Sequence, residues 1–546
     1  PRELAERLTE QSFALVEESG APSGEKWFVF VNPPVVNREL GIRRSYLAET
    51  RRVAGEFLRR NLQAIVFAQS RLATEILTTY LKEDFAGVPG DDQRIRGYRG
   101  GYLPGRRREI ERGLRAGHVR GVVSTNALEL GLDIGALDVS VMAGYPGTIA
   151  ATWQRAGRAG RRHSRSAAVL VASSAPVDQF VIRHPSYFFD ASPEHALINP
   201  DNLHILLAHV KCAAFELPFK TDETFGRENV QEVLGVLSEA GFVHLTADAE
   251  GASAWFWTSE SYPADAVSLR SVSSDNFVIV DTTRGADVIG ETDFTSGPAT
   301  VHPKAIYLME GKLFQVERLD FEGRKAYVRE IDCDYYTDAI THTRVKILDE
   351  FESAGGSSFG APPPDARAAA LSTHGEVHVV SRVVGFKKIK FYTNENVGSG
   401  ELDLPEQQMH TTSYWLTVPR ELMTTLPFAS DDRRDGVVGL SFAMRHVAAL
   451  LLMCDRHDLG ISINSGDEPS EDDDSRIFLF DNYPGGIGFS EPLFRMHHAL
   501  LKKTHELIAG CDCEAGCPTC VGPIGDTGPM AKTAALRILD LLLQPR

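Results

Sequence analysis

The chain of 546 residues is 43% hydrophobic and 24% charged, with a formal net charge of -17. This length corresponds to roughly three or four domains, and the composition is that of an ordinary soluble globular protein. The acidic balance excludes a protein that coats nucleic acid through overall positive charge, but it permits a local basic groove.

Membrane and targeting signals are missing from the sequence. No stretch approaches the roughly 18 to 20 apolar residues of a membrane span, and the opening PRELAERLTEQSF has no signal-peptide core. We therefore expect a cytoplasmic protein with no membrane partner. The chain starts at Pro1 without a methionine, which indicates a fragment.

The first 60 residues are interpreted as the connection from a preceding domain. They contain a predicted helix over Glu3–Glu18, a strand KWFVFVN that ends at Pro33, and a second helix over Ser45–Asn61. From residue 61 to 198, short apolar strands alternate with helices of about ten residues, a pattern typical of a parallel sheet covered on both faces. Residues 61–198 are therefore predicted to form one α/β lobe.

The rest of the chain divides by composition into four further parts. Helices followed by a hairpin over 199–262 favour a winged-helix-like module, and strands with Gly-containing turns over 263–350 favour a small β-rich module, which we expect to close as a barrel. Residues 351–372, rich in Gly, Ser, Pro and Ala, read as a flexible linker. Residues 373–546 return to mixed α/β and carry a cysteine cluster. The predicted fold class is thus multidomain α/β.

Positive charge is concentrated in one region. Residues 91–165 contain fourteen arginines and no lysine, against seven Asp and Glu. A basic region inside an acidic chain is typical of a nucleic-acid track or a phosphate site.

The segment Gln154-Arg155-Ala156-Gly157-Arg158-Ala159-Gly160-Arg161 lies within this basic region. Arginines at intervals of three fall near one helical face, and guanidinium groups suit bidentate phosphate contacts. The glycines allow close approach of a ligand. The alternative is a solvent-exposed basic helix, which would more often carry Lys/Glu pairs and no glycine.

Two upstream segments could complete a phosphate site. Ser124, Thr125 and Asn126 follow a buried strand and start a helix, so that free N–H groups and a hydroxyl face a possible phosphate, or merely cap the helix. Gly131 and Asp133 lie in a loop where the carboxylate could accept a hydrogen bond from a ribose hydroxyl or cap a turn.

A glycine-rich loop, Tyr98 to Tyr102, precedes both segments. Arg99, Gly100 and Tyr102 supply a cation, a flexible backbone and an aromatic ring, a combination suited to gripping a nucleic-acid backbone.

In order and spacing these segments resemble the second RecA-like lobe of superfamily-2 helicases. AIVFAQSRLATEIL resembles the motif IV region, STNALELGLDIG motif V and QRAGRAGRR motif VI. When the cysteine tail after LFDNYPGGIGFSE is considered with these motifs, the chain resembles MrfA-type helicases, which are bacterial relatives of a eukaryotic RecQ-like repair helicase.

The resemblance implies roles for the site residues. Arg158 and Arg161 would act as arginine fingers on the ATP γ-phosphate, with the nucleotide-side positions at Gln154, Arg155, Gly131 and Asp133. Ser124, Thr125, Asn126 and the Arg99–Tyr102 loop would contact DNA phosphates.

The sequence lacks the other half of such a nucleotide site. It contains no Walker A loop, G-x-x-x-x-G-K-[ST], and Asp349-Glu350, the pair that looks most like a DExx box, follows motif VI instead of preceding it. We expect the first RecA-like lobe to be missing from this chain. Because that lobe would be needed to bind ATP and magnesium, we expect this chain to be inactive on its own.

The second strong signal is Cys511-x-Cys513-x3-Cys517-x2-Cys520, which holds four of the seven cysteines. Four thiolates at this spacing can close a tetrahedral shell around a structural zinc ion, whereas the spacing is poor for two unstrained disulfides. Cys454 or His457 could replace one ligand, although a packed core pair is the simpler interpretation. The Gly-rich Tyr483–Gly488 segment has no lysine and predicts a turn near the zinc module.

The sequence predicts two alternative functions. The first is the C-terminal part of an ATP-dependent DNA helicase that, by its resemblance, moves 3′ to 5′ on single-stranded DNA and serves DNA repair. The alternative is a non-catalytic nucleic-acid-binding or regulatory protein with a degenerate RecA-like lobe.

Overall fold

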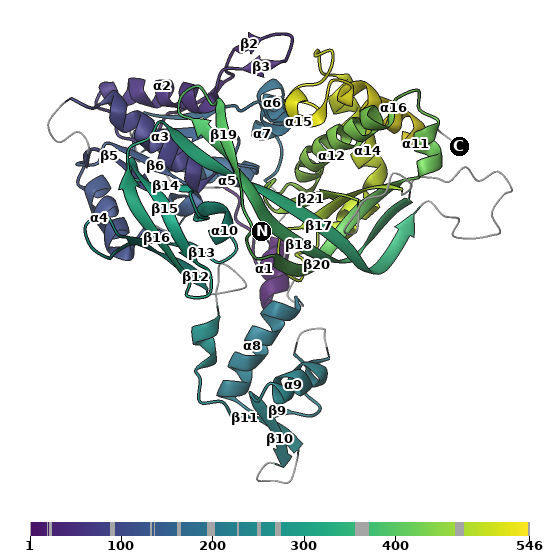
Figure 1. Cartoon of the computed structure of the whole chain (residues 1–546). Helices are drawn as coiled ribbons and strands as arrows, with labels where there is room; N and C mark the ends of the chain where they lie inside the picture. Colours follow the sequence, from purple (N-terminus) through teal and green to yellow (C-terminus); the bar gives the residue numbers. More distant parts are fainter. Residues whose placement is uncertain are drawn as a thin grey trace.

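The computed structural model describes residues 2–18, 20, 24–87, 93–130, 134–135, 137–160, 165–193, 202–225, 229–247, 253–267, 275–354, 371–464 and 474–543. Four sheets of three or more strands organise these residues, and the chain runs through them nearly in order (Figure 1).

The first unit is a six-stranded, all-parallel sheet in the order β1-β8-β7-β4-β6-β5. Its strands are β1 (Lys26–Val31), β4 (Ala64–Phe67), β5 (Ile95–Tyr98), β6 (Gly121–Ser124), β7 (Val139–Ala143) and β8 (Ser166–Val171). Its helices are α2 (Tyr46–Arg59), α3 (Arg71–Asp84), α4 (Pro104–Arg115), α5 (Ile149–Gly157), α6 (Pro176–Arg183) and α7 (Pro185–Phe189), with the 3-10 turn η2 (Asn126–Leu128).

Alternation along β4 explains why both faces of this sheet are covered. Ile65 and Phe67 pack with residues of α4 to α7, whereas Ala64 and Val66 pack with residues of α2 and α3. All four β4 side chains are fully buried. The prediction of an α/β lobe with a parallel sheet is confirmed.

The lobe begins earlier than residue 61. β1 pairs with β8 over its whole length, and the Lys26 Nζ donates to the Ala156 carbonyl at 2.8 Å, so residues 26–31 form the edge of the sheet. The prediction that residues 1–60 are only a connection is wrong for this strand and for α2. The helix expected over Glu3–Glu18 is shorter, α1 (Arg2–Thr9), and Glu10 after it has a positive φ of 55°.

The second unit is a small helix-plus-sheet module that projects downward in Figure 1. It consists of α8 (Leu203–Glu216), β9 (Phe219–Lys220), α9 (Val230–Glu239), β10 (Val243–Ala247), β11 (Ser253–Trp257) and η3 (Pro263–Ala266). The sheet order is β10-β11-β9, and its core packs Leu206, Val210 and Leu234 together. The arrangement is that of the predicted winged helix.

The third unit is a five-stranded sheet in the order β13-β12-β16-β15-β14, in which β12 and β16 are parallel. The strands are β12 (Asn276–Asp281), β13 (Asp287–Asp293), β14 (Ile306–Met309), β15 (Lys312–Asp320) and β16 (Lys325–Ile331), and α10 (Gly297–Thr300) follows β13. Within the described residues β13 and β14 are the two edges and do not pair, so the sheet is open and the expected barrel closure is wrong.

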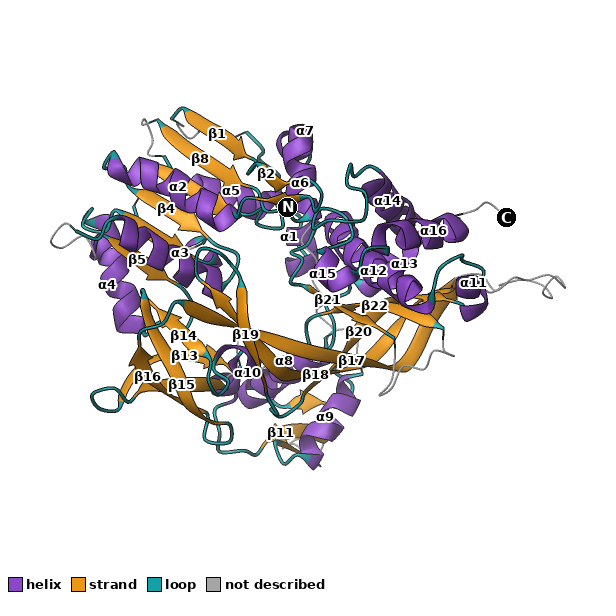
Figure 2. Ribbon diagram, turned by 45° about the horizontal axis from the view of Figure 1, so that its top comes forward, coloured by secondary structure: helices purple, strands orange, loops and turns teal. Residues whose placement is uncertain are grey.

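The fourth unit is a strongly curved antiparallel sheet (Figure 2). Its strands are β17 (Tyr335–Ala354), β18 (Leu371–Lys390), β19 (Asn396–Glu401), β20 (Gln407–Val418), β21 (Leu459–Ile463) and β22 (Ser475–Asp481). Its helices are α11 (Arg420–Thr424), α12 (Ser430–Leu452), α13 (Ser490–Arg495), α14 (His497–Ala509), α15 (Ile524–Thr527) and α16 (Ala531–Leu543). A two-stranded hairpin of the lobe, β2 (Val35–Asn37) and β3 (Ile42–Arg43), lies beside this unit.

Two predicted boundaries move because β17 pairs with β18. Residues 335–350 belong to the C-terminal sheet and not to the β-rich module, and Asp349 and Glu350 lie inside β17. The linker predicted over 351–372 overlaps the strands at both ends, and its centre, 355–370, lies outside the described residues.

Helix α12 is long and apolar enough to cross a membrane, with a mean hydropathy of 1.4 over its most apolar 18 residues, of which 67% are buried inside the protein. It packs against α14 and α16 in the largest hydrophobic core of the chain. Its burial identifies α12 as the central helix of the C-terminal domain.

Helix α12 approaches α16 closely at Gly436. A Cβ added there would lie 2.6 Å from the Ala534 Cβ and 3.1 Å from the Ala534 carbonyl carbon. We expect Gly436→Ala to destabilise the C-terminal domain by about 1–3 kcal/mol, because overpacking outweighs the gain in helix propensity. Thermal unfolding followed by calorimetry measures the change.

Gly235 in α9 is the matched control, since an added Cβ would meet nothing within 4 Å. Gly235→Ala should stabilise the winged helix by roughly 0.5–1 kcal/mol through helix propensity alone. Equal effects of the two substitutions would contradict the packing argument.

Candidate functional site

The arginine-rich segment lies at the end of α5 and is joined to the loop after β6. Arg155 is buried and pairs with the Glu129 carboxylate at 2.7 Å, and its guanidinium lies over the Phe67 ring. Arg158 donates to the Glu129 carbonyl from Nε at 3.1 Å and from a terminal nitrogen at 2.7 Å. One acidic residue therefore holds both arginines against the motif V loop.

This geometry changes the role of Arg155. The sequence predicts a nucleotide contact, whereas the structure buries the guanidinium on Glu129. Of the other predicted nucleotide-side residues, Gln154 is exposed on α5 and Arg158 is half-buried. Arg161, Gly131 and Asp133 lie outside the described residues.

The Ser124–Asn126 segment lies at the carboxyl end of β6, where parallel strands present their following loops at one edge of the sheet. Thr125 accepts a hydrogen bond from the Ala127 N–H and caps η2, and Asn126 is exposed. The Ser124 hydroxyl is fully buried and has no hydrogen-bond partner. Asn126 and the half-buried Thr125 are thus the members of this segment that a ligand can reach.

The side chains of Arg99 and Tyr102 are not available to nucleic acid, which corrects the prediction for these two residues. Arg99 and Tyr102 are 3% and 0% exposed. Both contact the buried Glu75 carboxylate on α3 at 2.7 Å, Arg99 from Nε and Tyr102 from its hydroxyl. Gly100 precedes Gly101, whose carbonyl accepts from the Glu291 N–H of β13 at 2.9 Å. The loop is an internal joint between the lobe and the β-rich module.

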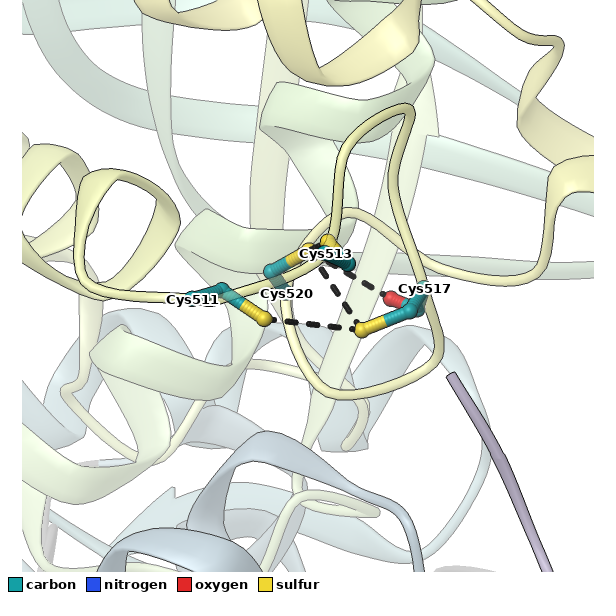
Figure 3. A group of neighbouring side chains, drawn as sticks. All are labelled: Cys511, Cys513, Cys517 and Cys520. Atoms are coloured by element: carbon teal, nitrogen blue, oxygen red, sulfur yellow. Dashed lines mark hydrogen bonds between the residues drawn. The ribbon is translucent and has the colours of Figure 1, made fainter. Parts of the chain in front are cut away.

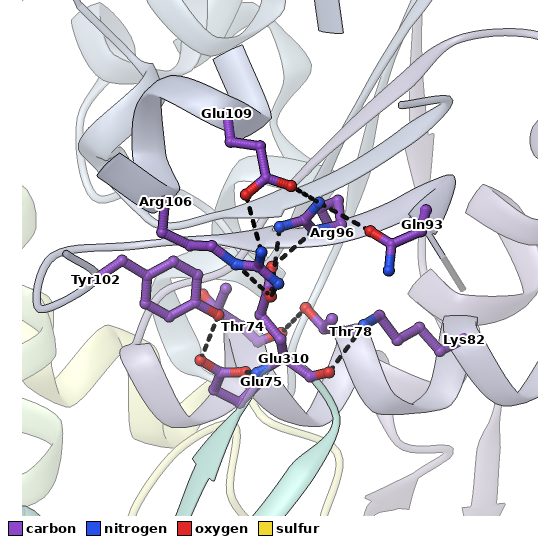
Figure 4. A network of polar contacts seen from close by, with 10 residues as sticks. All are labelled: Thr74, Glu75, Thr78, Lys82, Gln93, Arg96, Tyr102, Arg106, Glu109 and Glu310. Atoms are coloured by element: carbon purple, nitrogen blue, oxygen red, sulfur yellow. Dashed lines mark hydrogen bonds and ion pairs between the residues drawn. The ribbon is translucent and has the colours of Figure 1, made fainter. Parts of the chain in front are cut away.

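The turn between β14 and β15 completes this joint (Figure 4). Glu310 donates its N–H to Glu75 at 2.7 Å, and its carboxylate accepts from Arg96 at 2.8 Å and from Arg106 at 2.6 Å. The Glu310 carbonyl accepts from Lys82 at 2.8 Å. Burial, and then the Glu75 carboxylate, raise the pKa of Tyr102 well above its usual value, so its hydroxyl stays a donor.

The four cysteines Cys511, Cys513, Cys517 and Cys520 converge in one loop (Figure 3). Their sulfur atoms all lie within 4.8 Å of one another, with separations of 3.6 Å for Cys511–Cys517, 3.5 Å for Cys513–Cys520 and 3.8 Å for Cys517–Cys520. A tetrahedral zinc ion with Zn–S bonds of about 2.3 Å requires sulfur separations of roughly 3.8 Å. All four are free thiols, and the distances exclude disulfides.

The surroundings of the cysteines fit a bound cation. Hydrogen bonds from Cys517, and then from Cys520, lower the pKa of the Cys511 thiol, whereas hydrogen bonds with Cys511 raise the pKa of the Cys517 and Cys520 thiols. Lys532 donates to the Cys511 carbonyl at 2.6 Å and to the Cys513 carbonyl, which fixes the loop. Cys454, a possible alternative ligand, is buried in the apolar core and lies outside the cluster, and His457 pairs with Asp455 at 2.8 Å.

The zinc loop also contacts the lobe. A Cβ added to Gly41, in the β2–β3 turn, would lie 2.7 Å from the Cys517 Cβ, and the Thr519 hydroxyl donates to the Ser174 carbonyl at 3.1 Å. Nearby, Arg456 donates to the Gln69 amide oxygen at 2.7 Å beside a cavity of about 220 Å³. The C-terminal domain therefore contacts the lobe beyond the carboxyl ends of β4 and β8.

Sequence reasoning missed Glu129, Glu75 and Glu310. Glu129 lies within the motif V segment, so its position was visible, but its partners Arg155 and Arg158 are known only from the fold. Glu75 and Glu310 lie in segments without any motif, and no local pattern could have paired them with Arg99 and Arg96.

Three protein-family models match separate parts of the chain. Residues 49–163 match the helicase conserved C-terminal domain, residues 198–272 the winged helix domain of the ATP-dependent helicase HRQ1, and residues 440–521 the MrfA Zn-binding domain. With that last match, the sulfur geometry assigns the four cysteines as the ligands of a structural zinc ion.

Individual relatives cover nearly the whole chain. The uncharacterized ATP-dependent helicase YprA of Bacillus subtilis (strain 168) is 46% identical over 99% of this chain and 69% of its own length. The ATP-dependent helicase HRQ1 of Saccharomyces cerevisiae is 27% identical over 93% of this chain, which spans only 47% of that relative. The crystal structure of the DUF1998 helicase MrfA bound to DNA is 44% identical, with a TM-score of 0.72, over 99% of this chain and 69% of that one.

Removal of a zinc ligand should abolish metal binding. We expect about one zinc ion per chain by elemental analysis of protein purified without chelator, and a loss of that ion in Cys520→Ser, whose side chain is fully buried in the cluster. Cys212→Ser, which changes a half-buried cysteine of α8, should retain it. Zinc-free wild-type protein would overturn the assignment.

Removal of Arg99 should act on stability and not on nucleic-acid contact. Arg99→Ala leaves Glu75 buried with one neutral donor and one backbone donor, which we expect to cost about 3–5 kcal/mol of unfolding free energy. Arg108→Ala, on the exposed face of α4, should change stability little. Chemical denaturation of both variants decides between the two roles.

Proposed function

The chain belongs to the family of superfamily-2 ATP-dependent helicases that includes YprA and MrfA, and from this we propose that it supplies the second motor lobe, the winged helix and the zinc module of a DNA helicase. In this proposal ATP and magnesium bind between this lobe and a first RecA-like lobe that carries the Walker A loop and the DExx box. The sequence of this chain contains no Walker A loop.

The observation that carries the proposal is the attachment of Arg155 and Arg158 to Glu129. The buried Arg155–Glu129 pair fixes the end of α5 on the motif V loop, and the Glu129 carbonyl holds the Arg158 guanidinium beside it. A preorganised guanidinium can stabilise charge on a transferring phosphoryl group without reorganising when the reaction occurs. In the proposed function Arg158 and Arg161 are the arginine fingers, and Gln154, Gly131 and Asp133 lie on the nucleotide side.

Single-stranded DNA is the proposed nucleic-acid partner. The relative MrfA has been crystallised bound to DNA, and the fold of this chain matches that complex with a TM-score of 0.72. Thr125 and Asn126, at the carboxyl end of β6, are the accessible residues of motif V and would contact the phosphate backbone. Movement from 3′ to 5′ and a role in DNA repair, in the cytoplasm, are proposed on the likeness to MrfA-type enzymes.

The alternative function is a nucleic-acid-binding or regulatory protein without hydrolysis. The absent Walker A loop favours it for this chain taken alone. The attachment of Arg158 to motif V favours a motor, because a purely binding protein gains nothing from a guanidinium held at the end of α5.

Arg158→Ala should separate the two functions. In the full-length product of the gene we expect DNA-stimulated ATP hydrolysis to fall about a thousandfold or more, with nucleotide affinity changed far less, because a finger acts mainly on the transition state. The 546-residue chain alone should hydrolyse ATP negligibly. A coupled phosphate-release assay with single-stranded DNA measures both.

Arg165→Ala is the matched control, since Arg165 is exposed and pairs with Glu25 at 3.0 Å. It should leave hydrolysis unchanged. Unaltered turnover of the Arg158 variant, or robust turnover by this chain alone, would contradict the assignment of the catalytic halves.

A further inference from the structure

Within the described part of the chain, one side chain forms the hydrogen bonds between the winged-helix module and the other domains. Among the described residues, every hydrogen bond and ion pair that links residues 202–267 to other parts of the protein comes from Asn202. Asn202 is 5% exposed and precedes α8, and the module extends from this point away from the remaining domains (Figure 1).

The Asn202 amide uses its full hydrogen-bonding capacity across this joint. Its Oδ1 accepts from the His204 N–H at 3.1 Å and from the Ile205 N–H at 3.4 Å, which caps α8. Its Nδ2 donates to the Pro484 carbonyl at 3.1 Å and to the Gly486 carbonyl at 2.9 Å. One planar group therefore orients the first turn of α8 relative to the Tyr483–Gly488 turn.

The turn that receives the amide is itself rigid. The Asp481 carboxylate accepts from three successive N–H groups, those of Ile487, Gly488 and Phe489, at 2.7, 2.9 and 3.2 Å. The Gly485 N–H donates to the His410 carbonyl of β20 at 2.8 Å. The turn is thereby bound to the C-terminal sheet.

The glycines of the turn fit the amide closely. Gly485 and Gly486 have φ values of 77° and 72°, a region that favours glycine. A Cβ on Gly485 would lie 2.6 Å from the Asn202 Nδ2. The Gly-Gly pair provides the space that the amide requires, and Pro484 and Gly486 provide the two carbonyls.

We propose that Asn202 is the positioning residue that sets the orientation of the winged helix relative to the C-terminal sheet, so that the module meets nucleic acid at a defined angle. That the winged helix binds nucleic acid rests on the proposed function, whereas its attachment through Asn202 rests on the hydrogen bonds described above.

The chemistry of the joint requires an amide. Aspartate at position 202 keeps an oxygen that caps α8 but turns a carboxylate oxygen toward two carbonyl oxygens, which repel it. Serine caps the helix equally well but has one hydroxyl hydrogen and cannot donate to both carbonyls. Both substitutions therefore preserve the helix and remove the attachment.

Spin labels introduced as unnatural amino acids at Glu239 on α9 and Lys503 on α14, both exposed, report the orientation in the 546-residue chain without altering its cysteines. We expect one narrow label-to-label distance distribution in the wild-type protein. Asn202→Asp and Asn202→Ser should each replace that peak by a broad distribution, with helical content unchanged by circular dichroism.

Asn229→Asp is the matched control, because Asn229 caps α9 in the same module through the Gln231 N–H and, within the described part of the chain, forms no hydrogen bond outside that module. It should retain the narrow peak. A narrow, unshifted peak in both Asn202 variants would overturn the proposal, and Asn202→Ser decides if the aspartate variant does not fold.

A separate measurement distinguishes this joint from the proposed function. Fluorescence anisotropy with a labelled forked DNA tests whether the wild-type chain binds nucleic acid at all. Failure to bind would count against the proposed function and leave the distance result intact. Binding with an unchanged distance distribution in the variants would reject the role of Asn202 alone.

Discussion

The fully buried ion pair between Glu75 and Arg99 is the constraint on which the arrangement of the first and third units depends. Removing two charges from water is costly unless every remaining donor and acceptor is satisfied. Here Tyr102 and the Glu310 N–H complete Glu75, while Tyr307 and the Leu308 carbonyl complete Arg99. Because three of these four partners belong to the β14–β15 region, the lobe and the β-rich module satisfy each other's buried charges.

The other domain interfaces use different interactions, and this difference predicts which interfaces move. The C-terminal domain meets the lobe through hydrogen bonds that include Arg456–Gln69, Thr519–Ser174 and Tyr392–Tyr80. The winged helix is held by a single neutral amide. Neutral hydrogen bonds exchange with water at little net cost, whereas a buried ion pair does not. Motion during a functional cycle is therefore expected at the winged-helix joint and not at the Glu75–Arg99 joint.

Local patterns in the sequence predicted what local chemistry determines. The alternation of apolar strands and helices identified the parallel lobe, and the cysteine spacing identified the zinc ligands, since both depend on neighbours in the chain. The strand KWFVFVN was predicted, but its place at the edge of the lobe sheet was missed because its partner β8 lies far along the sequence. Arg99 was misassigned for the same reason: an arginine on a glycine-rich loop looks alike whether a phosphate or a distant glutamate receives it. Arg155 illustrates the point within one motif, because its burial on Glu129 follows from how α5 packs.

The contact of Gly41 with Cys517 has a consequence for how the polypeptide is made. The β2–β3 turn is synthesised well before Cys517, yet the surface it packs against forms only after the four cysteines have been synthesised and have bound metal. The hairpin therefore lacks this contact while the segments between it and the cysteines are translated. A shortage of zinc would then expose this hairpin to proteases, although it lies far from the cysteines in the sequence.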